Sequence, residues 1–177
     1  MKKIILIGVV LAIVIIGASF GYEYLSEKTE IPAPEAPNQE EKIPAPDFVM
    51  LDIDGNEINF SEFKGKPVVI NFWATWCGPC KREMPFFDEA YKEFGDEIEF
   101  IMLNVPEGDT IEGAKEFSKE NGYTFPLYFD ADFSGARIYG ITSFPTTVFI
   151  DKEGNVSAGY IGALNRDTIF QNLESIR

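Results

Sequence analysis

The strongest constraint on the fold is an uninterrupted apolar run that leads into a helical pattern. Residues 67–74 read PVVINFWA, and Asn71 is the one polar side chain among them. A strand without a polar face has both faces covered, as the central strands of an α/β sheet do. Residues 77–94 then place apolar side chains at helical spacing and predict a helix that ends at Gly95. The sequence therefore predicts a central sheet with helices packed against it.

The same alternation extends over residues 47–177, which we interpret as one domain. Residues 48–60 predict a hairpin that turns at Asp54 and Gly55. Asp109 and Glu112 form a pattern of the capping-box type at the start of a further helix. We expect other strands at residues 98–105, 125–130, 146–151 and 156–161, and helices at residues 109–121, at 133–139 and after the capping residue Asn165.

The N-terminus has the pattern of a membrane segment. Two lysines precede an apolar run over residues 4–20, which approaches the length that spans a bilayer core of about 30 Å. We interpret residues 1–25 as a single-pass anchor in the cell membrane, or as a signal peptide whose removal would leave a secreted or periplasmic protein. The positive-inside tendency then places the domain of residues 47–177 outside the cytoplasm. Residues 26–46 repeat the sequence IPAP and predict an extended extracytoplasmic linker.

The composition excludes several kinds of function. The chain has 29 acidic and 15 basic residues, and a formal net charge of −14 repels nucleic acid. It has no histidine, which removes the Ser-His-Asp and Cys-His catalytic systems and the commonest metal ligand. Two cysteines cannot complete a tetrahedral zinc site within one chain, although a site shared between two subunits stays open. We expect no metal and no nucleic-acid partner.

Both cysteines lie at the junction between the predicted strand and helix, in the segment WCGPC. The spacing of Cys77 and Cys80 on a first helical turn brings them about 5–6 Å apart, within reach of a disulfide. The helix dipole favours the thiolate of Cys77, and Pro79 suits a first turn because its missing N–H has no partner there. A disulfide that closes so short a loop is a poor structural staple. We therefore predict a redox-active pair and no separate cofactor.

These motifs together resemble those of the thioredoxin superfamily. The segment WCGPC is followed by Pro85, and SFPTTVFI lies downstream at residues 143–150. Within this superfamily, the chain resembles the TlpA-like and ResA-like membrane-anchored thiol-disulfide oxidoreductases. The resemblance lies in the N-terminal apolar segment, in the sequence of residues 71–85 and in the additional αβ unit between residues 108 and 130. The resemblance implies a thioredoxin-like α/β fold, in which helices flank a central mixed sheet, with an N-terminal β-hairpin and one extra αβ insertion.

The resemblance also implies roles for individual residues. Cys77 matches the attacking cysteine and Cys80 the resolving cysteine of the family. Pro145 matches the cis-proline that faces the disulfide and leaves the neighbouring backbone free to pair with a substrate strand. An X-Pro bond adopts the cis form at a modest cost of about 0.5–1 kcal/mol. The other expected substrate-binding residues are Trp76, Gly78, Pro79 and Phe144.

One position departs from thioredoxin itself. Thioredoxin has a buried acid where this chain has Asn71, which cannot accept the proton that leaves Cys80. Glu83 lies three residues after Cys80 on the same predicted helix and could accept it, as the matching Glu does in ResA-like proteins. Burial would raise the pKa of Glu83 and suit it to this role. A solvated surface position for Glu83 stays open.

The resemblance implies an enzyme that reduces disulfides in other extracytoplasmic proteins, such as apocytochrome c, with electrons from a transmembrane thiol donor. The Gly-Pro dipeptide between the cysteines is the same as in thioredoxin. It favours a low reduction potential and therefore an enzyme that acts as a reductant. Two alternatives stay open. One is a redoxin-type thiol peroxidase, although the chain lacks an isolated peroxidatic cysteine. The other is a non-enzymatic thioredoxin-like binding module that delivers a metal or holds an unfolded client.

Overall fold

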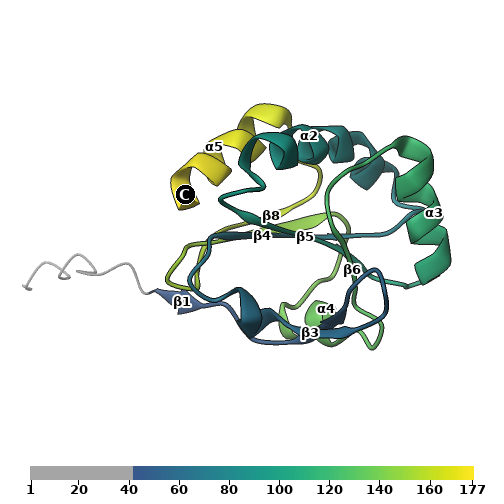
Figure 1. Ribbon diagram of the computed structural model, residues 1–177, viewed down its shortest axis with the longest axis horizontal. Coiled ribbons are helices and arrows are strands. Elements are labelled where there is room, and N and C mark those ends of the chain that lie inside the picture. Colours follow the sequence, from purple (N-terminus) through teal and green to yellow (C-terminus); the bar gives the residue numbers. More distant parts are fainter. Residues whose placement is uncertain (1–41) are drawn as a thin grey trace, which may run out of the picture. The chain divides into compact units, whose positions relative to one another are not determined.

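An eight-stranded mixed sheet organises residues 42–177, the part of the chain that the computed structural model describes (Figure 1). Its strand order is β1-β8-β7-β4-β5-β6-β2-β3. β4, β5 and β6 run parallel, and β7 and β8 are antiparallel to their neighbours. The strands are β1 (Ile43–Pro44), β2 (Val49–Leu51), β3 (Glu57–Asn59), β4 (Val68–Trp73), β5 (Glu99–Asn104), β6 (Leu127–Phe129), β7 (Thr146–Ile150) and β8 (Asn155–Ile161).

Helices cover both faces of this sheet, which is why β4 is buried along its whole length. The helices are η1 (Phe60–Phe63, a 3-10 helix), α2 (Gly78–Phe94), α3 (Ile111–Asn121), α4 (Ser134–Ile138) and α5 (Arg166–Ile176). One hydrophobic core joins the sheet to α2, α3 and α5. The second core, on the other face, joins it to the N-terminal hairpin, η1 and the segment around α4. The expected thioredoxin-like arrangement, with its additional α3–β6 unit, is confirmed.

Most local predictions agree with the structure. The first hairpin turns between β2 and β3, Asn165 caps α5 through its side chain, and Gly122 ends α3 in the left-handed conformation. The capping prediction for α3 is wrong, because Thr110 and not Asp109 is the N-cap and accepts a hydrogen bond from Gly113 N–H at 3.0 Å. Asp109 instead bonds to the segment before the cysteines, as described below.

The linker prediction also differs from the structure at its C-terminal end. Ile43 and Pro44, which the sequence places in the linker, form β1 and pair with β8. The predictions for residues 1–25 and for most of the linker lie outside the described residues. Within residues 42–177, no helix has both the length and the apolar character to span a bilayer.

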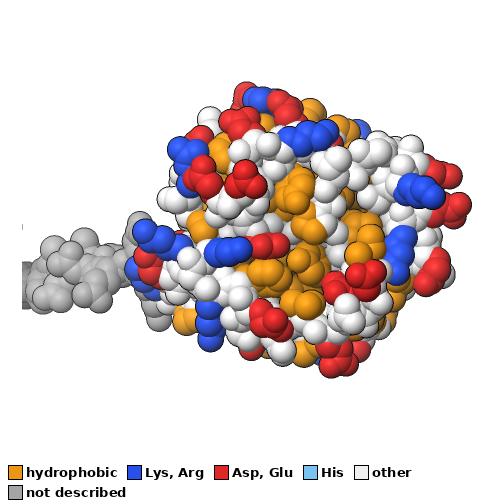
Figure 2. Space-filling model, viewed as in Figure 1, with side chains coloured by type: hydrophobic (Ala, Val, Ile, Leu, Met, Phe, Trp, Pro, Cys, Tyr) orange, Lys and Arg blue, Asp and Glu red, His pale blue; other side chains and the backbone are white. Residues whose placement is uncertain are grey.

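The surface carries charges of both signs. Figure 2 shows acidic and basic side chains interspersed over one face, around hydrophobic side chains that gather near its centre. This face therefore lacks the continuous basic stripe that nucleic-acid-binding proteins use.

The sheet topology places the two predicted halves of the site at one edge. β4 leads directly into the cysteine segment, and β7 begins directly after Pro145. Phe72 near the end of β4 pairs with Thr146 at the start of antiparallel β7. The segments that follow β4 and precede β7 therefore meet, although they lie far apart in the sequence.

Candidate active site

Cys77 and Cys80 form a disulfide across the first turn of α2, with their Cα atoms 5.3 Å apart. Cys77 is the N-cap residue, and its Sγ accepts a hydrogen bond from the backbone N–H of Cys80 at 3.1 Å. The exposed fraction is 3% for Cys77 and 0% for Cys80. A second thiol can therefore approach this disulfide only at Cys77, and the helix N-terminus stabilises a thiolate there.

Gly78 and Pro79 make the first turn of α2 and lie exposed beside Cys77. A proline fits here because the first N–H groups of a helix have no intrahelical partner. A Cβ on Gly78 would approach only the end of the Arg82 side chain, at 4.0 Å, so the backbone around the disulfide is open toward solvent. The role of both residues in substrate binding stays a prediction.

The peptide bond between Phe144 and Pro145 is cis, as the resemblance implied. The carbonyl of Pro145 accepts a hydrogen bond from Gly162 N–H at 2.8 Å, and Thr146 Oγ1 donates to the carbonyl of Ser143 at 2.8 Å. These bonds hold the loop on both sides of Phe144. Within residues 42–177 the backbone N–H and carbonyl of Phe144 themselves bond to nothing, which leaves them available to another chain.

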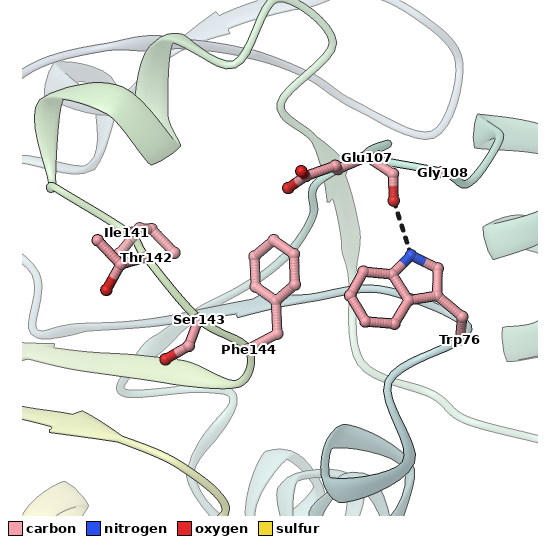
Figure 3. A pocket seen from close by; sticks show the side chains of 7 residues that line it. All are labelled: Trp76, Glu107, Gly108, Ile141, Thr142, Ser143 and Phe144. Carbon is pink, nitrogen blue, oxygen red and sulfur yellow. Dashed lines mark hydrogen bonds between the residues drawn. The ribbon is translucent and has the colours of Figure 1, made fainter.

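Trp76 forms one wall of a groove beside the disulfide. Its side chain is 56% exposed, and its Nε1 donates a hydrogen bond of 2.7 Å to the carbonyl of Glu107 (Figure 3). The Trp76 ring lies edge-on to the Phe144 ring, with centroids 5.9 Å apart. The cavity lined by Trp76, by Glu107 and Gly108 and by the 141–144 segment has a volume of about 780 Å³. Trp76 thus faces solvent and is not part of the core.

Glu83 is buried on the face of α2 that carries Cys80, and its side chain is 1% exposed. Its Oε1 accepts a hydrogen bond from Asn71 Nδ2 at 2.8 Å, and its Oε2 accepts one from Leu164 N–H at 2.7 Å. Burial raises the pKa of Glu83 from 4.5 to about 7, although both hydrogen bonds act in the opposite direction. The interpretation of Glu83 as a solvated surface residue is therefore wrong.

Asn71 links Glu83 to the sheet, which sequence reasoning missed. Its Nδ2 also donates to Thr147 Oγ1 at 3.0 Å, while its Oδ1 is buried without a hydrogen-bond partner within residues 42–177. Thr147 lies opposite Asn71 on the neighbouring strand β7. No local pattern signals this contact, because it joins positions 76 residues apart in the chain.

A second missed network holds the backbone just before the cysteines. Asp109 Oδ2 accepts a hydrogen bond from Thr75 N–H at 2.7 Å and one from Asn104 Nδ2 at 3.2 Å. Burial raises the pKa of Asp109, but these hydrogen bonds outweigh it and hold the pKa below its ordinary value. The loop between β5 and α3 therefore fixes the chain that leads into Cys77 through Asp109 and through the carbonyl of Glu107.

This site, a disulfide at a helix N-terminus on a thioredoxin-like fold with Cys77 as its less buried cysteine, is that of a thiol-disulfide oxidoreductase. The comparisons with known proteins agree. The model of the AhpC/TSA family matches residues 42–158, and the chain belongs to this family. The thiol-disulfide oxidoreductase ResA of Geobacillus thermodenitrificans is 39% identical over 134 residues, which cover 75% of this chain and 76% of that protein.

Two further relatives extend the match. ResA of Bacillus thuringiensis subsp. konkukian is 34% identical over 181 residues, which cover 99% of this chain and 98% of that protein. Among solved structures, the exposed lipoprotein thioredoxin of Streptococcus pneumoniae is 34% identical with a TM-score of 0.64, and the match covers 73% of this chain and 99% of that chain. The chain is thus a thiol-disulfide oxidoreductase similar to the ResA proteins.

Proposed function

We propose that this enzyme reduces disulfide bonds in other proteins outside the cytoplasm through Cys77 and Cys80. The observation that carries the proposal is the disulfide at the start of α2, in which Cys77 is the less buried cysteine, together with the unpaired backbone of Phe144, whose ring contacts Trp76 next to Cys77. A substrate strand could pair with that backbone and bring its own disulfide to Cys77. Gly78 and Pro79 are exposed next to Cys77, which supports an approach of the substrate to Cys77 from solvent.

The reaction consists of two thiol-disulfide exchanges. The thiolate of Cys77 attacks one sulfur of the substrate disulfide, and the other substrate sulfur leaves as a thiolate and takes up a proton. Cys80 then loses its proton and attacks Cys77 in the mixed disulfide, which releases the second substrate thiolate. The substrate gains two electrons and two protons, and the enzyme is left with the Cys77–Cys80 disulfide.

Glu83 is proposed as the group that accepts the proton of Cys80. Cys80 is fully buried, so water does not reach its thiol directly. Glu83 lies one helical turn further on the same face of α2, and burial raises its pKa to about 7. A carboxyl that titrates near neutral pH exchanges protons in both directions, as a relay must.

The location and the partners are further parts of the proposal. The pattern of residues 1–25 supports a membrane anchor, and one similar solved structure is an exposed lipoprotein thioredoxin. A disulfide-containing extracytoplasmic protein, such as apocytochrome c, would be the substrate. A transmembrane protein with a reactive dithiol would reduce the Cys77–Cys80 disulfide after each turnover.

Trapping of the mixed disulfide tests the proposal. A Cys80→Ser variant cannot resolve the intermediate. When the full-length variant is expressed in cells, it should therefore accumulate disulfide-linked complexes through Cys77. Mass spectrometry of these complexes identifies the substrate, and the Cys77→Ser variant is the matched control that should trap nothing. Equal complex formation by both variants, or by neither, would contradict the proposal.

The two alternatives predict other results. A peroxidase would consume hydrogen peroxide in the presence of a thiol reductant, and we expect no such turnover because both cysteines belong to one CXXC pair and the chain has no isolated peroxidatic cysteine. A binding module would keep its activity in both cysteine variants. Equilibration with glutathione buffers measures the reduction potential of the Cys77–Cys80 disulfide and so shows whether the enzyme reduces or oxidises its substrates. We expect a low potential, as a reductant has.

A further inference from the structure

The groove beside the disulfide combines aromatic walls with one carboxylate. Trp76 and Phe144 supply the rings, and the 141–143 segment lines the other side of the groove. Figure 3 shows the carboxylate of Glu107 turned toward the space between this segment and Phe144. Among the residues that the structure describes, no lysine or arginine lines the groove. The groove therefore presents a negative charge above aromatic surface.

The carboxylate of Glu107 forms no ion pair within the described part of the chain. Its side chain is exposed, and within residues 42–177 no lysine or arginine lies within ion-pair distance of its carboxylate. Its backbone carbonyl, in contrast, fixes the Trp76 ring through the bond from Nε1. The backbone of Glu107 thus has a structural role, while its side chain is free to meet a charge on another molecule.

The groove is lined by residues that adjoin the active-site groups in the chain. Trp76 precedes Cys77 in the chain, and Phe144 precedes the cis-proline, so both walls are adjacent to groups of the active site. A substrate strand that pairs with the free backbone of Phe144 advances about 3.3 Å per residue. A side chain within two residues of the substrate cysteine therefore lies close enough to enter the groove.

We propose that the groove is a specificity subsite for a lysine or arginine side chain that lies within two residues of the substrate cysteine. This inference rests on the proposed function, because it assumes that a disulfide-containing polypeptide binds at Phe144. The aliphatic stem of such a side chain would pack on the rings of Trp76 and Phe144, and its cation would meet the Glu107 carboxylate.

Other side chains fit this groove less well. An acidic side chain would be repelled by Glu107 and by a protein whose formal net charge is −14. An apolar side chain would gain the aromatic contact but would partly desolvate the Glu107 carboxylate without a partner. A cationic side chain satisfies both features of the groove.

The expected effect is moderate because the groove is open to solvent. An exposed ion pair and an exposed cation–π contact are each weak, and together they give a preference of about tenfold, equivalent to about 1.4 kcal/mol. The part that depends on Glu107 should shrink as the salt concentration rises, because salt screens exposed charges.

The test uses three peptides that are identical except for the residue two positions from a single cysteine, which is arginine, glutamine or glutamate. Each cysteine carries a mixed disulfide with 2-mercaptoethanol, which is uncharged. Stopped-flow fluorescence measures the second-order rate constant at which each peptide oxidises the reduced enzyme. We expect the arginine peptide to react about tenfold faster than the glutamine peptide, and the glutamate peptide to be slowest.

Substitution of Glu107 assigns the preference to the groove. The Glu107→Gln variant keeps the backbone bond to Trp76 and should lose most of the preference, while Glu107→Lys should favour the glutamate peptide. The control is Glu116→Gln, which removes one exposed charge from α3 outside the groove and should behave as the parent enzyme.

The results distinguish failure of the subsite from failure of the reductase function. Equal rates for the three peptides, or a preference that Glu107→Gln leaves intact, would overturn the subsite while the reductase function stands. If no peptide oxidises the reduced enzyme, the proposed function itself fails, and with it the subsite.

Discussion

The buried carboxyl of Glu83 should make the free energy of unfolding depend on pH. Burial raises its pKa from 4.5 to about 7, so the native state binds this proton more tightly than the unfolded chain does. The free energy of unfolding therefore falls as the pH rises from 4.5 to about 7, and the loss is complete above that range. A shift of this size corresponds to about 3 kcal/mol, at about 1.4 kcal/mol for each pH unit.

The Glu83→Gln variant removes this titration and keeps the shape of the side chain. Leu164 N–H can still bond to the amide oxygen, and Asn71 can turn its own amide so that its unpartnered Oδ1 faces the new N–H group. We therefore expect a cost of about 1 kcal/mol that does not depend on pH. The parent has already lost about 0.8 kcal/mol at pH 5, so the variant should be nearly as stable as the parent there and more stable by about 2 kcal/mol at pH 8.

Urea denaturation of the oxidised protein, followed by tryptophan fluorescence between pH 5 and pH 8, measures this difference. The disulfide form is used because its cysteines do not titrate. Glu93→Gln, an exposed position on the same helix, is the matched control and should keep the pH dependence of the parent. If Glu83→Gln and the parent lose the same stability over this range, Glu83 titrates at its ordinary pKa and the proton relay loses its physical basis.

Three other substitutions test how the scaffold holds the site, each by urea denaturation. Asp109→Ala removes the acceptor of Thr75 N–H and should cost about 2 kcal/mol at pH 7, a cost that declines as the pH falls below 3.8, because the pKa of Asp109 lies under that value. Phe87→Ala deletes a fully buried ring between α2 and the sheet and should cost about 3–5 kcal/mol. Asn165→Ala removes the side-chain cap of α5 and should cost about 1 kcal/mol.

The features that the sequence predicted well are those that depend on neighbours in the chain. The apolar run at residues 67–74 and the helical pattern after it became β4 and α2, because burial on both faces and helical periodicity are local signals. The closeness of Cys77 and Cys80 follows from a single helical turn, so their disulfide geometry was predictable as well.

The features that were missed depend on contacts between distant segments. Asp109 and Thr110 are both good N-cap residues, and local chemistry does not choose between them. The structure assigns Asp109 to Thr75 N–H, 34 residues earlier in the chain, and that contact leaves Thr110 as the cap. The groove of Glu107 has the same origin, because it exists only where the β5–α3 loop meets the loop before β7.

This site differs from that of thioredoxin in the element that carries the buried acid. Thioredoxin carries the acid on the strand, where this chain has Asn71, and this chain carries it on the helix as Glu83. An amide on the strand can donate a hydrogen bond to the carboxylate, which a second acid could do only while protonated. Asn71 thus moderates the effect of burial on the Glu83 pKa, which lies at about 7. With Asp in place of Asn71, the two acids would repel each other when ionised, the pKa of one would rise further, and the proposed proton relay at neutral pH would be lost.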